Sequence, residues 1–317
     1  MHVAVGRWLL VVVLLGCAPA RDMDERIAVE SGGMLEVDLD FGDGLRPDPG
    51  SLQVLSHDAG EVRILAGATG WGASGVRFRV DPREGGVRFS GRVEGAFAWM
   101  FGGPKVQVHI LVPREFSLDL RCTAGSIRIE DVNGRVRART DDAPIEVVGA
   151  EGSVKLRTGH GDVEISEVLG NVEVRASAGH IDMRWITGDV EAHTGRGTID
   201  FAHLDGDVVV RTDRGNMELR EMSGAVDAKT ERGSVFASFV SAPGGVLETS
   251  RGNLRVVIPS GAGANLEALT RRGSVELGSG ISASPGKRPD RVTGPINGGG
   301  DDLRLYTARG TISVLAR

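Results

Sequence analysis

The sequence predicts an all-β protein built mainly as a β-solenoid, in which each 18-residue coil contributes two short strands. Three observations predict this fold. Glycine supplies 47 of the 317 residues and aromatic residues only 4%, a composition that suits short strands joined by tight turns. Glycines recur every 18 residues through the middle of the chain. Apolar and polar residues alternate between these glycines, as they do in strands with one buried face.

The first sixteen residues have the layout of a bacterial secretion signal. Arg7 precedes an apolar run, Trp8 to Leu15, that is too short to span a bilayer. The segment Leu14-Leu15-Gly16-Cys17 is similar to the lipobox of bacterial lipoproteins, whose cysteine takes a diacylglycerol and becomes the new N-terminus. We therefore expect a lipoprotein signal peptide over 1–16, and a lipidated N-terminus with a linker over 17–29.

Lipidation at Cys17 implies an exported protein held in the cell envelope, with the membrane as its partner through acyl chains such as palmitate. Ala18 follows the cysteine, where an Asp would resemble the inner-membrane retention signal of some Gram-negative bacteria. The outer membrane is therefore favoured if the source is Gram-negative. Cleavage near Ala20, which would release a soluble protein, is the alternative.

Charge and cysteine content narrow the function classes. Loss of Arg7 with the signal leaves 36 Lys and Arg against 43 Asp and Glu, a formal charge of −7, which argues against nucleic acid as a partner. After Cys17 the chain has only Cys122, so lipidation leaves no cysteine pair for an intrachain disulfide. We predict that Cys122 is a small packed residue, because no His or cationic helix end adjoins it to activate the thiol.

Residues 30–115 are expected to form a β-rich cap that covers one end of the coils, because terminal repeats must protect core and strand edges. The candidate strands of this cap are Met34 to Asp40, Val62 to Leu65, Val87 to Arg92 and Lys105 to Val112. Residues 116–317 are expected to form the β-solenoid repeat region of the same domain.

Two glycine columns divide each repeat into two nine-residue halves. The first contains Gly134, Gly152, Gly170, Gly188, Gly206 and Gly224. The second contains Gly125, Gly161, Gly179, Gly197, Gly215 and Gly233, with Ala143 in the missing place. Apolar columns lie between them, for example Val136, Val154, Val172, Val190, Val208 and Val226. One coil cannot bury such residues alone, so stacked coils are predicted; an antiparallel sandwich is the alternative.

A threonine column and an irregular C-terminal part complete the pattern. The column contains Thr140, Thr158, Thr194, Thr212 and Thr230. We interpret it as a structural ladder whose hydroxyls satisfy backbone groups at a turn. The period loosens from about residue 245, and residues 279–301, rich in Gly, Pro and Ser, are predicted to be a long loop before strands over Leu303 to Tyr306 and Thr311 to Leu315.

Taken together, these motifs resemble the DUF4097 family, which is labelled "putative adhesin" and is related to toastrack-type β-repeat domains of envelope-stress proteins. The resemblance extends over about residues 30–317 and rests on Lys105-Val-Gln-Val-His-Ile-Leu-Val-Pro113, the G-x-V-x-[VAL]-x-T-x-x-G-x-[VI] coils, and the ending Gly294 to Asp301 with Thr307 to Val314. It implies a repetitive β fold at the cell envelope and brings no catalytic residues.

Basic residues supply one candidate site. An outward column contains Arg139, Arg157, Arg175, His193, Arg211 and Lys229, and the last three are each followed three residues later by an arginine. We hypothesise a two-column edge for a polyanion or polysaccharide, formed by His193, Arg196, Arg211, Arg214, Lys229 and Arg232. The alternative is that the repeats merely duplicate charges that keep a solenoid soluble and discourage sheet pairing.

Large apolar residues supply a second candidate site. Phe97, Trp99, Met100 and Phe101 lie between two predicted strands, at the tip of a hairpin. Such a tip would be unfavourable in water unless it is covered, so it is a candidate contact for a membrane or a protein partner. Packing against the end of the solenoid is the alternative.

No catalytic residue, metal site or cofactor is predicted. An acidic column, which contains Glu146, Glu164, Asp182, Asp200 and Glu218, offers the paired carboxylates of a polysaccharide lyase or hydrolase. A regular ladder, however, gives each carboxylate a similar environment, whereas acid–base catalysis needs two that differ.

We predict a non-enzymatic, adhesin-like or scaffold module that binds a glycan or an envelope protein. An accessory of envelope-stress signalling is the second hypothesis, and a carbohydrate-active β-helix enzyme is the third.

Overall fold

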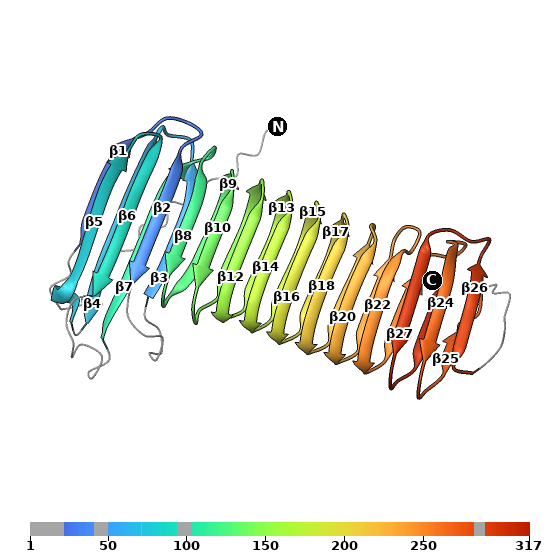
Figure 1. Cartoon of the computed structure of the whole chain (residues 1–317). Helices are drawn as coiled ribbons and strands as arrows, with labels where there is room; N and C mark the ends of the chain where they lie inside the picture. Colours follow the sequence, from blue (N-terminus) through green and yellow to red (C-terminus); the bar gives the residue numbers. More distant parts are fainter. Residues whose placement is uncertain (1–21, 41–49, 71, 94–102, 282–288) are drawn as a thin grey trace, which may run out of the picture.

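The protein is a β-solenoid in which the chain winds between two facing sheets (Figure 1). The structure, a computed structural model, describes residues 22–40, 50–70, 72–93, 103–281 and 289–317. Within these ranges each sheet has 14 strands. The helical structure of these residues is one 3₁₀ turn, Ala73–Gly75, and none of their helices is long and apolar enough to cross a membrane.

The first sheet, called sheet A, contains most of the odd-numbered strands. In spatial order they are β1 (Met23–Ala28), β4 (Glu61–Gly70), β7 (Pro104–Pro113), β3 (Gly50–His57), β9 (Ser126–Asn133), β11 (Ile145–Glu151), β13 (Val163–Leu169), β15 (Ile181–Thr187), β17 (Ile199–Asp205), β19 (Met217–Met222), β21 (Val235–Phe239), β23 (Leu254–Ile258), β28 (Ile312–Ala316) and β25 (Val275–Leu277).

The second sheet, called sheet B, contains most of the even-numbered strands. In spatial order they are β26 (Arg291–Ile296), β24 (Ala264–Thr270), β27 (Asp302–Thr307), β22 (Gly245–Arg251), β20 (Val226–Arg232), β18 (Val208–Arg214), β16 (Val190–Arg196), β14 (Val172–Ala178), β12 (Val154–His160), β10 (Val136–Thr140), β8 (Ser117–Cys122), β2 (Met34–Asp40), β6 (Gly86–Val93) and β5 (Val76–Arg83).

In the regular coils of the parallel sheets, residues that pair between neighbouring strands are 18 positions apart in the sequence, which is the predicted period. Val136 pairs with Val154, and Val154 pairs with Val172, so identical positions of successive coils lie side by side. Inward side chains from both sheets form one continuous apolar core. The predicted all-β solenoid is therefore confirmed, and every outward column of the sequence becomes a straight row on the surface.

Both ends of the solenoid depart from the regular repeat. At the N-terminal end, β1 pairs antiparallel with β4, and β5 pairs antiparallel with β6. At the C-terminal end, β27 lies between β22 and β24, so its coil stacks out of chain order (Figure 1). At the C-terminal end β24 also pairs antiparallel with β26, so antiparallel pairs form the outer edge of sheet B at both ends.

The predicted loop over residues 279–301 is wrong in its second half. Arg291–Ile296 form β26, which pairs antiparallel with β24. Gly294 and Pro295 weaken the strand signal of this segment, but β26 is the outermost strand of sheet B. An edge strand tolerates proline, because one side of the strand has no neighbour that needs its N–H.

The corner after β16 shows why the close stacking of the coils requires glycine. A Cβ atom at Gly197 would lie 1.9 Å from the carbonyl oxygen of Gly179 in the preceding coil, and the φ angle of Gly197 is +153°. Both the space and the backbone conformation therefore require glycine. The same close approach follows through the next coils, at Gly215, Gly233, Gly252, Gly310 and Gly273.

We predict that Gly197→Ala lowers the free energy of unfolding by about 2–4 kcal/mol, because the added methyl group forces two coils apart in a strained conformation. Gly60→Ala is the matched control, since its Cβ would meet only the Val29 oxygen at 3.7 Å, and we expect a change within about 0.5 kcal/mol. Urea unfolding followed by circular dichroism measures both changes. Equal stability of the two variants would contradict this role of the corner.

Candidate binding edge of the solenoid

The predicted basic edge lies at one end of the sheet B strands, and its two columns are in register. In the first column His193 pairs with Arg211, and Arg211 pairs with Lys229. In the second column Arg196 pairs with Arg214, and Arg214 pairs with Arg232. All six side chains are exposed. The structure thus brings together the residues that the spacing selected.

The first column is partly neutralised by neighbouring carboxylates. Arg175 forms ion pairs with Glu173 at 3.1 Å and Glu191 at 3.4 Å, and Lys229 pairs with Glu248 at 2.9 Å. A shallow groove of about 570 Å³ follows this column from β10 to β16. The ionisable residues that line it are Arg139, Asp141, Arg157, Arg175 and His193.

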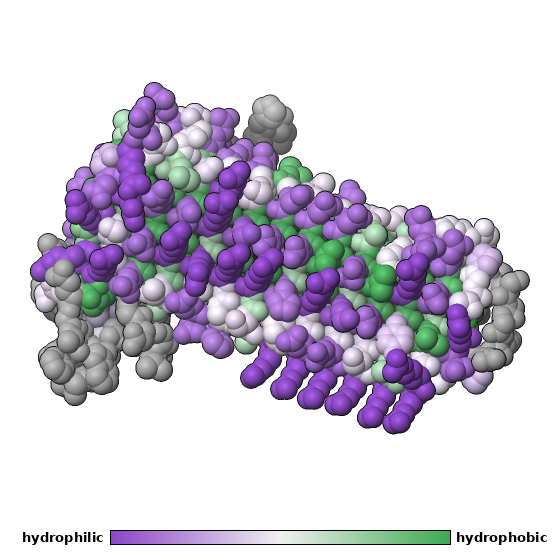
Figure 2. Space-filling view, viewed as in Figure 1, coloured by the Kyte–Doolittle hydropathy of each residue, from purple (hydrophilic) through white to green (hydrophobic). Residues whose placement is uncertain are grey.

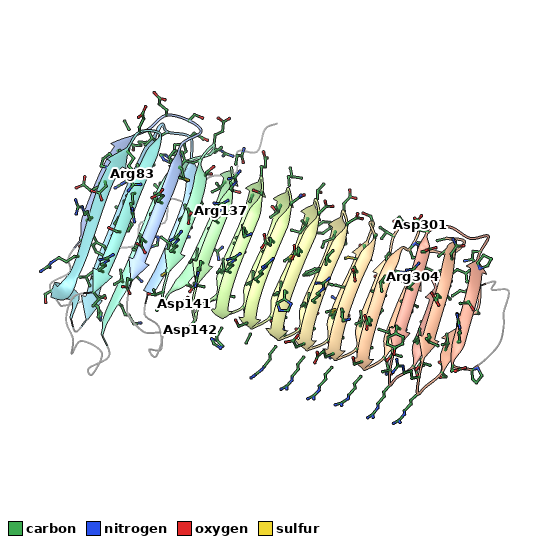
Figure 3. The ribbon with its side chains drawn as sticks, in the orientation of Figure 1. Arg83, Arg137, Asp141, Asp142, Asp301 and Arg304 are labelled. Atoms are coloured by element: carbon green, nitrogen blue, oxygen red, sulfur yellow. The ribbon has the colours of Figure 1, made fainter. Side chains whose placement is uncertain are left out.

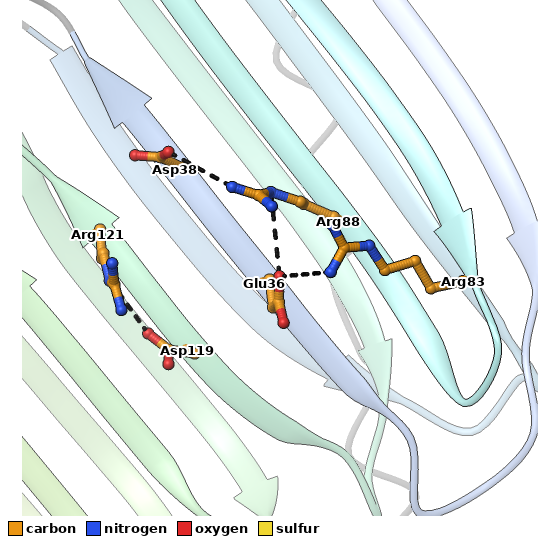
Figure 4. Close-up of polar contacts among 6 residues, drawn as sticks. All are labelled: Glu36, Asp38, Arg83, Arg88, Asp119 and Arg121. Carbon is orange, nitrogen blue, oxygen red and sulfur yellow. Dashed lines mark hydrogen bonds and ion pairs between the residues drawn. The ribbon is translucent and has the colours of Figure 1, made fainter.

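The face of sheet B beside the N-terminal end is neutralised in the same way (Figure 4). Arg83 pairs with Glu36 at 3.2 Å and Arg121 pairs with Asp119 at 3.7 Å, while Arg88 lies within 4.0 Å of both Glu36 and Asp38. These three arginines therefore have carboxylate partners on the same strand (Arg121), on the adjacent strand (Arg88) or two strands away (Arg83).

The second column continues well beyond the three predicted arginines. Arg232 pairs with Arg251, the Arg309 carbonyl accepts a hydrogen bond from Gly252 N–H, and the Arg272 carbonyl accepts one from Gly310 N–H. The resulting surface, which we call the arginine row, contains Arg196, Arg214, Arg232, Arg251, Arg309 and Arg272 in spatial order. A line of long hydrophilic side chains projects from this edge of the C-terminal half (Figures 2 and 3).

The arginine row lacks the carboxylate partners found elsewhere. Within the described ranges, none of its six guanidinium groups takes part in an ion pair or a side-chain hydrogen bond, and all six side chains are exposed. Two unit charges about 4 Å apart repel by roughly 1 kcal/mol in water and by less in salt. The row is therefore a concentrated positive edge on a chain whose formal charge is −6.

Sequence reasoning found only half of the row because the other half lies outside the regular period. Arg251, Arg272 and Arg309 are separated from one another by 21 and 37 residues, and the coil that ends at Arg309 stacks between the other two. A local signal was nevertheless present. Each arginine lies in a Thr-x-Arg-Gly segment, beginning at Thr194, Thr212, Thr230, Thr249, Thr270 and Thr307.

The threonine column has the structural role predicted for it. Thr194 Oγ1 donates a hydrogen bond to the Gly179 carbonyl at 3.2 Å, and Thr249 Oγ1 donates to the Gly233 carbonyl at 2.8 Å. The other threonines of these segments bind the corresponding glycine carbonyls at Gly197, Gly215, Gly252 and Gly310. Thr140 differs, because its Oγ1 is buried with no hydrogen-bond partner.

This contrast allows a direct test of the threonine ladder. Thr194→Val removes a buried hydrogen bond and should lower the free energy of unfolding by about 1 kcal/mol. Thr140→Val removes a buried hydroxyl that has no partner, so stability should be unchanged or should rise. Thermal and urea unfolding distinguish the two outcomes, and a larger loss for Thr140→Val would contradict the ladder.

Sequence reasoning also missed an exposed aromatic stack on sheet A. Trp185 stacks on His203 with ring centroids 3.8 Å apart and an interplanar angle of 7°, and His203 Nδ1 lies 2.6 Å from a carboxylate oxygen of Glu221. The Trp185 side chain is 58% exposed. All three residues have φ near +58°, in a column that also contains Gly149. That glycine was the available signal of a left-handed bend.

The remaining predicted site residues divide into two groups. Cys17, Phe97, Trp99, Met100 and Phe101 lie outside the described residues. Cys122 is 2% exposed, and its thiol donates a hydrogen bond to the Ala124 carbonyl at 3.3 Å. Burial raises the pKa of the Cys122 thiol to about 12, which fits the prediction of a small packed residue.

The carboxylates whose pKa values depart from normal are shifted downward. A hydrogen bond from Arg63 lowers the pKa of Asp24, and a hydrogen bond from Lys155 lowers that of Glu173. Both shifts favour the ionised carboxylate. Within the described ranges, no group of three or more His, Cys, Asp and Glu residues is arranged to hold a metal ion.

Comparison with known families agrees with the architecture. A family model described as Toastrack DUF4097 matches residues 152–315, just over half of the chain. The chain belongs to this family. The Toastrack match begins just before β12 and ends within β28, so it includes all six arginines of the row and the coil that stacks out of order.

Three solved structures are similar at low identity. A "putative cell adhesion protein" from Clostridium sporogenes ATCC 15579 has 11% identity and a TM-score of 0.20, with 94% of this chain and 100% of that chain covered. A "putative adhesin" from Bacteroides fragilis NCTC 9343 has 10% identity and a TM-score of 0.25, with 94% of this chain and 97% of that chain covered. A "putative lipid binding protein" from Parabacteroides distasonis ATCC 8503 has 10% identity and a TM-score of 0.27, with 93% of this chain and 96% of that chain covered. No curated protein matches the chain.

Proposed function

We propose that this Toastrack protein is a non-enzymatic, adhesin-like binding module anchored in the bacterial envelope through Cys17. The observation that carries the proposal is the basic edge, whose residues His193, Arg211 and Arg214 lie exposed and in register along a continuous solenoid. A rigid row of this kind can contact an extended ligand at several points without changing shape. The proposed partner is an envelope glycan.

The electrostatics of the carboxylates support a binding role over a catalytic one. A general acid in a glycosidase needs a carboxyl whose pKa is raised. The shifts found here, at Asp24 and Glu173, are downward and arise from partners that stabilise the charged form. Three carboxylates of the acidic column, Glu146, Asp182 and Glu218, likewise form ion pairs with arginines, for example Asp182 with Arg184 at 2.7 Å.

A protein partner in envelope-stress signalling is the second candidate function. The exposed Trp185 favours it, because tryptophan is enriched at the energetic centres of protein interfaces. The stack on His203 holds the indole ring in one orientation, which reduces the entropy that a partner would have to overcome. Trp185 therefore belongs in the same experiment as the basic edge.

The test is a pull-down from intact envelope with the lipidated protein as bait and with bound glycans and proteins both identified. We expect wild type to capture a glycan that Arg211→Glu combined with Arg214→Glu does not. A matched control, Arg135→Glu combined with Arg255→Glu, changes the charge equally at exposed positions outside the edge and should retain it. Cys17→Ser should shift the protein from the membrane fraction to the soluble fraction.

The remaining outcomes separate the two candidate functions. A protein captured by wild type and lost only with Trp185→Ala would favour the signalling partner over the glycan. Capture that is identical in all variants would contradict both proposed surfaces, and a Cys17→Ser protein that stays membrane-bound would contradict the anchor.

A further inference from the structure

The arginine is the one fixed residue of the Thr-x-Arg-Gly segments that the fold itself does not use. The threonine hydroxyl binds a glycine carbonyl of the preceding coil, as Thr212 does at Gly197. The glycine is required because a Cβ would collide with the carbonyl beneath it, as Gly215 would with Gly197 at 1.8 Å. The intervening Arg214 is exposed and has no carboxylate partner among the described residues. Its recurrence therefore needs a cause outside the folded chain.

Simple duplication of a repeat does not account for the row. Arg196, Arg214 and Arg232 follow the 18-residue period, but the next arginines come after 19, 21 and 37 residues. Arg272 and Arg309 also stand in the reverse of their sequence order in space, because β27 lies between β22 and β24. An arginine nevertheless occupies the same corner in each of these six coils. The earlier coils have Asp142, His160 and Ala178 at this corner, so the row is confined to the C-terminal half.

The geometry of the row selects the shape of its ligand. With coils about 4.8 Å apart, six arginines in single file extend over about 24 Å. The residues that precede Arg214 and Arg232 are Asp213 and Glu231, both exposed. A flat anionic surface such as a membrane would also meet these carboxylates and be repelled. A flexible chain that follows the single file of guanidinium groups can avoid them.

We propose that the arginine row binds a linear polyanion, a polymer whose carboxylate or phosphate groups are taken by successive guanidinium groups. Guanidinium matches both oxyanions through paired N–H donors. The proposal rests on the proposed function as a binding module and names its site and ligand class. Each exposed contact is weak, so affinity comes from several contacts made at once and depends on polymer length and on salt.

The experiment uses the full lipidated protein in neutral detergent, with oligogalacturonates of two, six and twelve residues and polyphosphate of matched charge as probes. Calorimetric titration should show affinity rising at least about tenfold from the dimer to the longer chains and falling with added salt. At equal charge, tighter binding of the oligogalacturonate identifies carboxylate as the preferred group, and tighter binding of polyphosphate identifies phosphate.

Two triple variants test the site itself. Arg214→Gln, Arg232→Gln and Arg251→Gln together should weaken binding of the twelve-residue oligomer about tenfold or more, because three exposed charge contacts are lost. Arg184→Gln, Arg220→Gln and Arg255→Gln remove the same charge from sheet A and should change affinity less than about twofold. Equal unfolding midpoints confirm that both variants are folded.

Three results would overturn the proposal. They are equal losses in the two triple variants, affinity independent of polymer length, and binding to vesicles of anionic phospholipid without binding to either polymer. The envelope pull-down distinguishes this failure from that of the proposed function. A glycan still captured through Arg211 and Arg214, while the row triple has no effect on the polymers, leaves the binding module standing and removes only the extended row.

Discussion

The structure depends on the contact between glycines at one corner of the solenoid. There the carbonyl oxygen of one coil lies where the Cβ of the next coil would be, as Gly179 does beneath Gly197. Only glycine allows the coils to stack here at the spacing of hydrogen-bonded strands, and the threonine hydroxyl that binds the same carbonyl stabilises the contact. Because both residues recur in each of these coils, the backbone positions around them repeat, and the side chain between them reaches the surface at the same place.

Arginines on the flat face of sheet B and arginines at this corner have different surroundings. Beside the N-terminal end, Arg83 and Arg121 lie on the flat face of sheet B, where Glu36 on β2 pairs with Arg83 and Asp119 on the same strand pairs with Arg121. At the corner of the C-terminal half, the exposed arginines of the row lie at strand ends or in the bends that follow them, and they have no such neighbours among the described residues. The same fold therefore gives a neutralised face and a positive edge, and the positive edge is where a negatively charged ligand gains most.

Periodicity in the sequence was enough to predict the coils, the core columns and the first three arginines of the row, because each follows an 18-residue spacing. It could not predict the C-terminal order, since pairing of β22 with β27 is a long-range choice that no local pattern encodes. For the same reason Arg251, Arg272 and Arg309 were missed, although their Thr-x-Arg-Gly segments are visible in the sequence. The strand β26 was missed because Gly294 and Pro295 are usual in loops and are tolerated at an edge.

Disulfide formation between paired cysteines tests the stacking of the row most directly. Arg251→Cys with Arg309→Cys places two cysteines on adjacent coils, about 5 Å apart, within the range that a disulfide bridges, whereas Arg251→Cys with Arg272→Cys separates them by about 10 Å. Cys122 is buried and does not compete. Under mild oxidation of the lipidated protein, the first pair should close quickly and the second should stay reduced, even though Arg272 is nearer to Arg251 in the sequence. Preferential closure of the second pair would contradict the coil order and, with it, the continuous arginine row.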